Sequence, residues 1–386
     1  MMVLPQPTSG RPGRPGPPAA FADVLRLGRP QSHGSLTVVP LSFWSDRGPR
    51  YETLATALRA GTFHVTEVSA GGSVPELRVI NEGATGVLIL DGEELVGAKQ
   101  NRVLNATVFV REKSSMVVPV SCVEAGRWHS SGHEFAGEEY VVHAQVRRAV
   151  HESVSLSLGA AGGHRSDHGL VWQEVAELQQ FAESPSQTGA ERDVYTQRAG
   201  DIAGYLDAFP LQSGQHGLLV LRDGEVVGMD FVSRAGGYAQ VHAKLLRSYA
   251  FDAVTRGMSR ERAVGHGGKG AAGQKGAPGV TGANGEIDEG TGLRPAAALD
   301  RSRSFLGAIA GLPGRSFKSP GRGWDVRYAG DGISGSTLTV GGVAVHGAFF
   351  AAEDGRGGGG LVTADARDEP RMAGFDRRRR NRGLEG

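Results

Sequence analysis

A run of polar side chains follows the first well-marked apolar segment of the chain. The stretch "ILDGEELVGAKQNRVLNATVFV" covers residues 89–110. Its polar residues after Gly97 are Lys99, Gln100, Asn101, Arg102 and Asn105. Amide side chains offer paired donors and acceptors, and a guanidinium offers a planar fork that suits phosphate or carboxylate. The run could therefore form the wall of a site for a polar, phosphorylated ligand, or only the solvated rim of a hairpin.

A second group of reactive side chains lies in "VVPVSCVEAGRWHSSGHEF", residues 117–135. Glu124 could act as a general acid or base, or bind a pair of ribose hydroxyls. Arg127 could bind phosphate while Trp128 stacks on a base, although Arg127 could equally form an ion pair with Glu124. Cys122 could be a nucleophile only with a neighbouring base and a lowered pKa. A buried small residue is the simpler interpretation of Cys122, because cysteine is among the most buried residue types.

The histidines have a spacing that would suit a metal site on a helix. His129 and His133 are four residues apart, as are His164 and His168. Both pairs lie in segments rich in Gly and Ser, so the helical geometry that would join them is not expected and no metal site is predicted. The chain also lacks a Walker A loop, a G-x-S-x-G elbow, an H-E-x-x-H motif and a CxxC pair.

The elements that must position these residues are mainly strands in the first half of the chain. Residues 35–44, 63–68 and 76–82 have strand patterns, and "YETLATALRAG" (51–61) predicts a short helix ended by Gly. "GVLILDGEELVG" (86–97) predicts a hairpin with a type I′ turn at Asp91-Gly92. Strands then continue to about residue 123.

The second half alternates helices and strands. Residues 171–183, 191–209, 239–254 and 302–312 have helical patterns, the third with Val241, Leu245, Tyr249 and Ala253 on one face. Residues 217–232 and 324–350 have strand patterns. The predicted fold class is α+β, with a β-rich core of antiparallel hairpins and several packed helices. "GLLVLRDGEVVG" (217–228) repeats the pattern of residues 86–97, and this indicates either two related halves or two hairpins of a common type.

Composition sets the predicted boundaries of the domain. Of 386 residues 60 are Gly, and Gly recurs every third residue between 267 and 285. A disordered tail is expected at 1–21, one α+β domain at 22–351 with a Gly-rich insert at about 259–297, and a second disordered tail at 352–386. The collagen-like period of the insert is too short and too poor in proline to form a triple helix.

Charge and cysteine content exclude several classes of function. The net charge is +1, so the chain as a whole gives no electrostatic reason to bind nucleic acid or a membrane, and the basic "DRRRRNRG" is interpreted as a solvated tail. No apolar run is long enough for a membrane helix, and no signal peptide is recognised. With one cysteine there is no intramolecular disulfide. A cytoplasmic protein is expected.

Several of these segments together resemble a known family. They are "LRLGRPQSHGSLTVVPL", "YETLATALRAG", "LDGEELVGAKQNRVLNATV", "VPVSCVEAGRW" and "DVRYAGDGISGSTLTVGGVAVHGAFF". They are similar to the domain family named for its association with ADP-ribosylglycohydrolases and rhodanese-phosphatases, over residues 22–351. The most specific parts are the QNR-x-x-N and VSCVE-x-GRW stretches. The chain has Ala98 where the family tends to have a second Gly, and its Gly-rich insert and long tails are foreign to the family.

The resemblance implies a link to ADP-ribose and other NAD-derived metabolites. It suggests a domain that binds or processes such a nucleotide, with Glu124 as the candidate catalytic residue. The ligand-binding residues that it suggests are Glu93, Gln100, Asn101, Arg102, Asn105, Arg127 and Trp128. The alternative is a non-enzymatic structural or protein-interaction module, in which the same polar groups join hairpins through buried hydrogen bonds. Catalysis, a cofactor and the oligomeric state are not indicated by the sequence.

Overall fold

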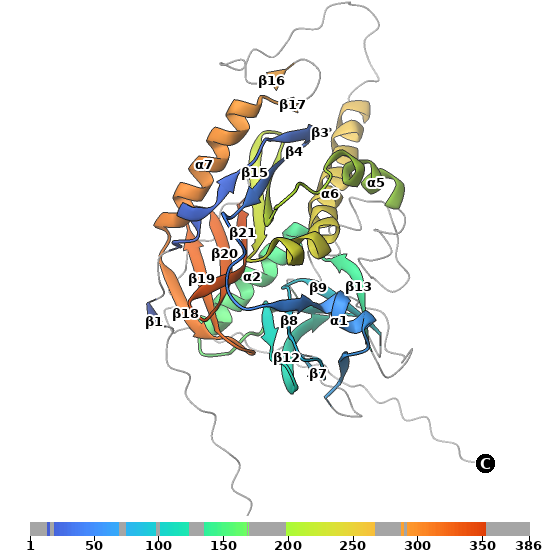
Figure 1. Ribbon diagram of the computed structural model, residues 1–386. Helices are drawn as coiled ribbons and strands as arrows, with labels where there is room; N and C mark the ends of the chain where they lie inside the picture. Colours follow the sequence, from blue (N-terminus) through green and yellow to red (C-terminus); the bar gives the residue numbers. More distant parts are fainter. Residues whose placement is uncertain are drawn as a thin grey trace, which may run out of the picture. The chain divides into compact units, whose positions relative to one another are not determined.

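The structure is a computed structural model of the chain (Figure 1). It describes residues 14–15, 19–68, 75–97, 101–122, 135–167, 169, 198–266, 287–288 and 292–352. Four of the predicted site residues lie outside these ranges, namely Gln100, Glu124, Arg127 and Trp128. The predicted helix at 171–183 and most of the Gly-rich insert lie outside them too.

The predicted α+β class is confirmed. Within the described residues, the first sheet has ten strands and the second has six. The first sheet has the order β1 (Arg14–Pro15), β18 (Gly314–Lys318), β19 (Trp324–Gly330), β20 (Ile333–Val340), β21 (Val343–Ala351), β15 (Glu225–Val232), β14 (Gly217–Arg222), β4 (Leu36–Ser42) and β2 (Arg26–Leu27), with β3 (Gln31–His33) also paired to β4. All of its neighbouring strands are antiparallel.

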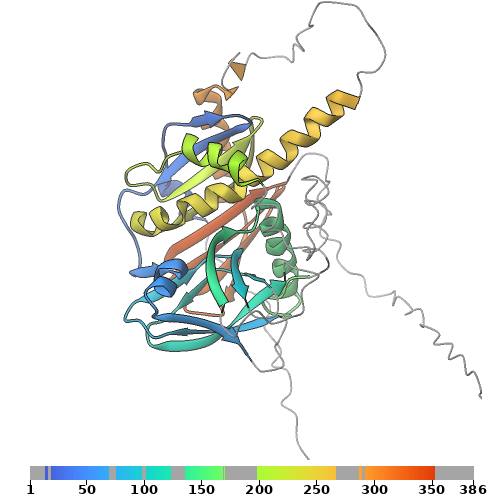
Figure 2. The ribbon, with the colours of Figure 1, turned by 90° about the vertical axis from the view of Figure 1, so that its right-hand side faces the viewer.

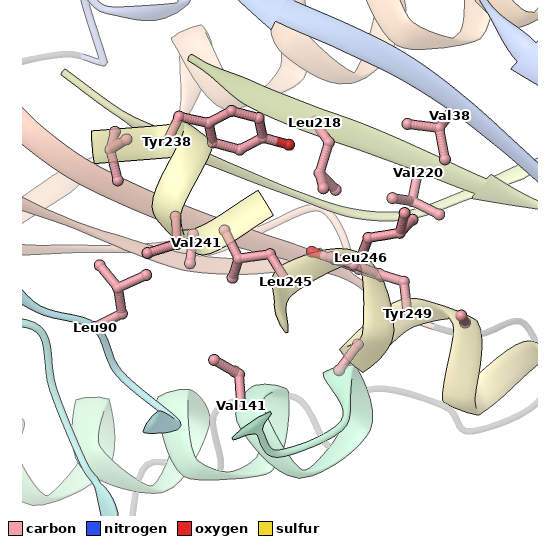
Figure 3. Close-up of a cluster of buried hydrophobic side chains, with 14 of the residues drawn as sticks. Val38, Leu90, Val141, Leu218, Val220, Tyr238, Val241, Leu245, Leu246 and Tyr249 are labelled. Atoms are coloured by element: carbon pink, nitrogen blue, oxygen red, sulfur yellow. The ribbon is translucent and has the colours of Figure 1, made fainter. Parts of the chain in front are cut away.

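Helices cover both faces of the first sheet, which explains its nearly continuous apolar strands. Alternate residues of a strand point to opposite faces. Leu218 and Val220 of β14 therefore face α6 (Ala235–His266), while Leu219 and Leu221 face α7 (Pro295–Gly311). Figure 3 shows the α6 side, where Val241, Leu245 and Tyr249, predicted to share one face of the helix, pack against the sheet. Each such buried aliphatic side chain stabilises the fold by about 1.5–3 kcal/mol.

The second sheet encloses a separate apolar core. Its order is β13 (Phe135–Val141), β9 (Glu93–Gly97), β10 (Arg102–Leu104), β12 (Ser114–Cys122), β7 (Glu76–Asn81) and β6 (Phe63–Glu67). The two edge strands β13 and β6 contact each other, so the sheet curves around the core. Leu54 and Ala57 of α1 (Leu54–Arg59) pack into this core, and α1 confirms the short helix predicted within residues 51–61. A three-stranded sheet of β11 (Val108–Val110), β8 (Gly86–Ile89) and β5 (Tyr51–Thr53) supplies the rest of it.

The predicted hairpin at residues 86–97 is wrong. β8 pairs with β11 and β5, while β9 pairs with β10 and β13, so the turn between them joins two different sheets. A type I′ turn needs a positive φ at both central residues, and here only Gly92 has one, at 76°. In the second copy, Asp223 and Gly224 both have positive φ, at 50° and 87°, and β14 and β15 form a true hairpin. The two similar sequences therefore have different strand pairings.

The helix α2 (Ala144–Gly159) is not among the helices predicted from the sequence. Its valines and serines have only modest helix propensity. It forms because Val146, Val150, Val154 and Leu158 recur every fourth residue and pack together on one face. α5 (Ala199–Ala208) confirms the C-terminal part of the helix predicted at 191–209.

The described residues also mark the ends of two predicted flexible segments. α6, the long yellow-to-gold helix in Figure 2, continues to His266, and α7 begins at Pro295, so helix occupies both ends of the predicted insert. Between them lie the short strands β16 (Ile287–Asp288) and β17 (Gly292–Leu293). Near the N-terminus, β1 pairs with β18, and Ala19 is buried just before the 3-10 helix η1 (Ala22–Val24). Within the described residues, no helix is long and apolar enough to cross a membrane.

Candidate functional site

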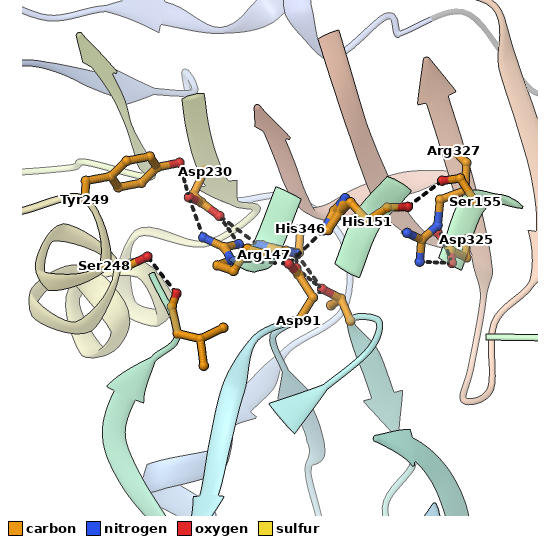
Figure 4. Close-up of polar contacts among 12 residues, drawn as sticks. Asp91, Arg147, His151, Ser155, Asp230, Ser248, Tyr249, Asp325, Arg327 and His346 are labelled. Carbon is orange, nitrogen blue, oxygen red and sulfur yellow. Dashed lines mark hydrogen bonds and ion pairs between the residues drawn. The ribbon is translucent and has the colours of Figure 1, made fainter. Parts of the chain in front are cut away.

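The most concentrated group of buried charges surrounds Arg147 of α2 (Figure 4). Nη2 and Nη1 of Arg147 donate to the two carboxylate oxygens of Asp230 on β15, at 2.6 and 3.0 Å. Nη2 also donates to Oδ2 of Asp91, at 3.2 Å. Asp91 belongs to the turn between β8 and β9. One guanidinium therefore joins α2, the first sheet and the turn that leads into the second sheet. Bidentate pairing to a carboxylate is the strongest geometry available to arginine.

Two histidines, a threonine and a tyrosine complete this group. Nε2 of His151 lies 2.8 Å from Oδ2 of Asp91, and the Thr107 hydroxyl donates to Oδ1 of Asp91 at 2.9 Å. Thr107 also contacts Nδ1 of His346 at 2.7 Å, and the hydroxyl of Tyr249 donates to Asp230 at 2.7 Å. We call this set the Arg147 cluster. It comprises Asp91, Thr107, Arg147, His151, Asp230, Tyr249 and His346.

Burial and charge set the protonation states of the Arg147 cluster. Burial by itself raises the pKa of Asp91, but the charge of Arg147 and the bond from His151 hold it well below its ordinary value. Burial also raises the pKa of Asp230, but the opposing effect, mainly from Arg147, is larger, so this pKa is lowered too. Burial lowers the pKa of His151, and the neighbouring Asp91 does not reverse this. The cluster therefore has two ionised carboxylates, one guanidinium and a neutral His151 at neutral pH.

The sequence contained a weak signal for this cluster. Asp230 interrupts the apolar run "VVGMDFV", and a charge at such a position must be paired if the strand is buried. Asp91 was interpreted only as a turn residue, and Arg147 lies in the unpredicted helix α2. The side chains of the cluster are all buried, so its geometry supports a structural role rather than direct contact with a ligand.

Glu93, one of the predicted ligand residues, has partners inside the fold. Its carboxylate accepts a hydrogen bond from the backbone N–H of Leu90 at 2.6 Å, and it forms an ion pair with Lys244 of α6. Both charged side chains are buried. Glu93 therefore anchors the second sheet to α6.

Asn101 and Asn105 flank β10, one just before it and one just after it, and they also have partners inside the fold. Nδ2 of Asn101 donates to Glu94 at 3.0 Å, and Asn105 accepts a hydrogen bond from the hydroxyl of Ser121 at 2.6 Å. Glu94 and Ser121 both pair with Val103, which places all of these side chains on the face that packs against α2.

Arg102 points to the opposite face of β10 from Asn101 and Asn105, because successive side chains of a strand alternate. Its register partners are Leu95 on β9 and Cys122 on β12. Arg102 is 2 % exposed and Cys122 is 1 % exposed. The side chains of Asn101 and Asn105 therefore lie on a different face from that of Arg102, rather than together on one wall. The burial of Cys122 confirms the simpler interpretation of that residue.

A second polar network extends from Asn105 into the first sheet. Nδ2 of Asn105 donates to the backbone oxygen of His164 at 3.1 Å, and Nε2 of His164 lies 2.9 Å from Oδ2 of Asp325 on β19. Arg327 donates to the same oxygen at 2.7 and 2.9 Å. Burial raises the pKa of Asp325, but Arg327 and His164 outweigh it and lower the pKa to about 2. His164 is thus paired with a carboxylate.

No metal site is found in the part of the chain that the structure describes. No group of three or more His, Cys, Asp or Glu side chains there could hold a metal ion. His129, His133 and His168 lie outside the described residues.

The strand ends bring the two predicted polar segments to one end of the second sheet. Arg102, the first residue of β10, pairs with Cys122, the last residue of β12. Gly97, the last residue of β9, pairs with Phe135, the first residue of β13. The connection from β9 to β10 and the connection from β12 to β13 therefore both start and finish at the same end of the sheet.

The fold and its buried network define an α+β domain in which ionic clusters join two sheets. A family model described as the ARG and Rhodanese-Phosphatase-superfamily-associated Protein domain, ARPP-1, matches residues 24–350. The chain belongs to this family, as its motifs predicted. No curated protein and no solved structure matches the chain.

Proposed function

We propose that this domain binds ADP-ribose or a related NAD-derived nucleotide at the end of the second sheet where β9, β10, β12 and β13 meet. The observation that carries the proposal is the register. The pairs Arg102–Cys122 and Gly97–Phe135 bring the ends of both polar segments to one place. The description of the family names ARG, and the resemblance that interprets ARG as ADP-ribosylglycohydrolase supports the choice of ligand. A site assembled from neighbouring strand ends and their connections is a common arrangement for function.

The hydrogen bonds and ion pairs of the described residues separate the proposed ligand residues from those that support the sheet. Arg127 binds phosphate, Trp128 stacks on the base and Gln100 binds a ribose or base edge, because each residue type has the matching chemistry. Glu124 is the acid/base residue if the nucleotide is hydrolysed. Glu93, Asn101 and Asn105 support the sheet instead, since Glu93 pairs with Lys244 and the two amides pair with neighbouring strands. Arg102 stays a proposed ligand residue at the first position of β10.

A second candidate function is a non-enzymatic structural or protein-interaction module. It is favoured by the same pairing, because Glu93, Asn101 and Asn105 already bond within the fold. Under this proposal the polar clusters only satisfy buried groups of a β-rich core. The two candidates differ in their response to nucleotides.

The test is calorimetric titration and thermal unfolding of the full chain with ADP-ribose, NAD, AMP and ribose 5-phosphate. A ligand present at about 100 times its dissociation constant stabilises the folded state by about 2.7 kcal/mol, which a melting curve resolves. Arg127→Ala should weaken binding by about tenfold or more, because a charge-assisted contact to phosphate is lost. Arg111→Ala is the matched control, since Arg111 is exposed at the other end of β12.

Catalysis is tested by an assay separate from the binding measurement. If the bound nucleotide is hydrolysed, Glu124→Gln should abolish product formation in a chromatographic assay and leave the affinity within about threefold, as expected for an acid/base residue. If no nucleotide in the panel binds or stabilises the chain, the first proposal is excluded and the second remains.

A further inference from the structure

A surface pocket of about 630 Å³ lies between the edge of the first sheet and the connection from α5 to β14. One wall is formed by residues 28–32, which include the start of β3, and the other by residues of the connection, such as Gln212 and Ser213. The floor includes Leu41 of β4. The volume falls in the range of pockets that hold small molecules. The pocket shares none of the residues of the proposed nucleotide site.

The walls of this pocket are fixed by hydrogen bonds rather than left loose. The backbone N–H of Gly28 donates to the oxygen of Pro40 at 2.7 Å, which holds the first wall against β4. The side chain of Gln215 donates to the oxygen of Gly217 at 2.8 Å and accepts from the N–H of Gln212 at 2.9 Å, which holds the second wall. A ligand would therefore bind a preformed surface, and these walls would lose little conformational entropy on binding.

The chemistry of the lining favours an anion that carries hydroxyl groups. Arg29 is the one ionisable residue of the lining, which contains no carboxylate. Among the residues that the structure describes, neither Arg29 nor Gln31 makes a side-chain hydrogen bond or ion pair, so both are available to a ligand. Ser32, Gln212 and Ser213 add hydroxyl and amide groups to the same lining. Guanidinium groups bind phosphate or carboxylate, and amides and hydroxyls bind sugar hydroxyls.

We propose that this pocket binds a small polyhydroxy anion, a sugar phosphate or sugar acid, with its anionic group on Arg29. The segment "GRPQSHG" that forms the first wall is one of the segments through which the chain resembles its family, and the proposed nucleotide site gives it no role. The pocket is independent of that site, so either can be correct without the other.

The test is calorimetric titration of the full chain with glucose 6-phosphate, gluconate and glucose. Glucose 6-phosphate or gluconate should bind and glucose should not, because the three share hydroxyl groups and differ in charge. The comparison of the two anions decides between phosphate and carboxylate. Arg29→Ala should weaken binding of the anion by about tenfold or more, and Arg29→Lys by less. Arg59→Ala, which removes another exposed arginine, should have no effect.

Arg29 is exposed, so its replacement should leave the melting temperature and any response to ADP-ribose unchanged. The proposal is overturned if neither anion binds at about 10 mM, a concentration that detects even weak binding. It is also overturned if Arg29→Ala binds the anion as well as the unaltered chain does.

Discussion

The carboxylates of Asp91 and Asp230 share the guanidinium of Arg147, although Asp91 lies in the turn after β8 and Asp230 lies within β15. Asp230 belongs to the first sheet and Asp91 to the turn that joins the three-stranded sheet to the second sheet, so their common partner fixes how these parts of the fold meet. All three side chains are buried, and water cannot replace a lost partner.

Removal of Arg147 should destabilise the fold strongly. Arg147→Ala leaves two buried carboxylates without their cation, so the free energy of unfolding should fall by about 3–5 kcal/mol in urea titrations. Arg148→Ala is the matched control on the same helix, because Arg148 pairs with the half-exposed Glu152 and with no other described residue. That change should cost less than about 1 kcal/mol. Equal losses for the two variants would contradict a special role for the Arg147 cluster.

A side chain at Gly92 should destabilise the fold, because Arg147 lies against this position. A Cβ at Gly92 would lie 2.8 Å from Cγ of Arg147, and the φ of 76° is strained for other residues. Gly61 has a similar φ of 66° but no atom within 4 Å of an added Cβ. Gly61→Ala should therefore cost about 1 kcal/mol from backbone strain alone. Gly92→Ala should cost at least about 1 kcal/mol more, since packing must also change. Chemical denaturation of both variants measures the difference, and equal costs would refute the contact.

Asp325 should contribute stability that acid removes. Its pKa in the folded chain is about 2, against an ordinary value of 3.8. A carboxylate with a lowered pKa stabilises the fold above its unfolded pKa, and this contribution disappears as the pH falls through the folded pKa. Asp325→Asn should thus be less stable by about 2 kcal/mol at pH 7, and the difference should shrink between about pH 4 and pH 2.

Unfolding curves at several pH values check the role of Asp325. Asp300→Asn, at a mostly exposed position on α7, is the control and should differ by less than about 0.5 kcal/mol throughout. A difference for Asp325→Asn that does not change with pH would show that its carboxylate is not specially stabilised.

His151 should make stability fall in mild acid. Burial lowers its pKa below 6.5, so the folded chain keeps it neutral while the unfolded chain takes up a proton. Stability therefore decreases as the pH drops from 6.5 toward about 5. His151→Gln removes this titration but can still donate to Asp91, so its unfolding free energy should depend less on pH in that window. His242, whose pKa burial also lowers, retains its own contribution of the same sign. An unchanged slope would show that the pKa of His151 does not differ between the folded and the unfolded chain.

Local patterns were sufficient to predict much of the fold. The spacing of Val241, Leu245 and Tyr249 predicted the helix that packs on the first sheet, and all three residues are buried there. The Asp223-Gly224 turn and the closing strands β19, β20 and β21 were likewise predicted. These features depend on residues close in sequence, so periodicity and turn chemistry reveal them. The family was also predicted from its motifs.

Only the tertiary structure decided what the polar residues do. Asp91-Gly92 has the sequence of a hairpin turn, yet Asp91 bonds to Arg147, His151 and Thr107, and the two strands beside it enter different sheets. Asn101 and Arg102 are neighbours in sequence but lie on opposite faces of β10. Such partners are distant along the chain, and the sequence carries the type of each side chain but not the residue that burial will place beside it.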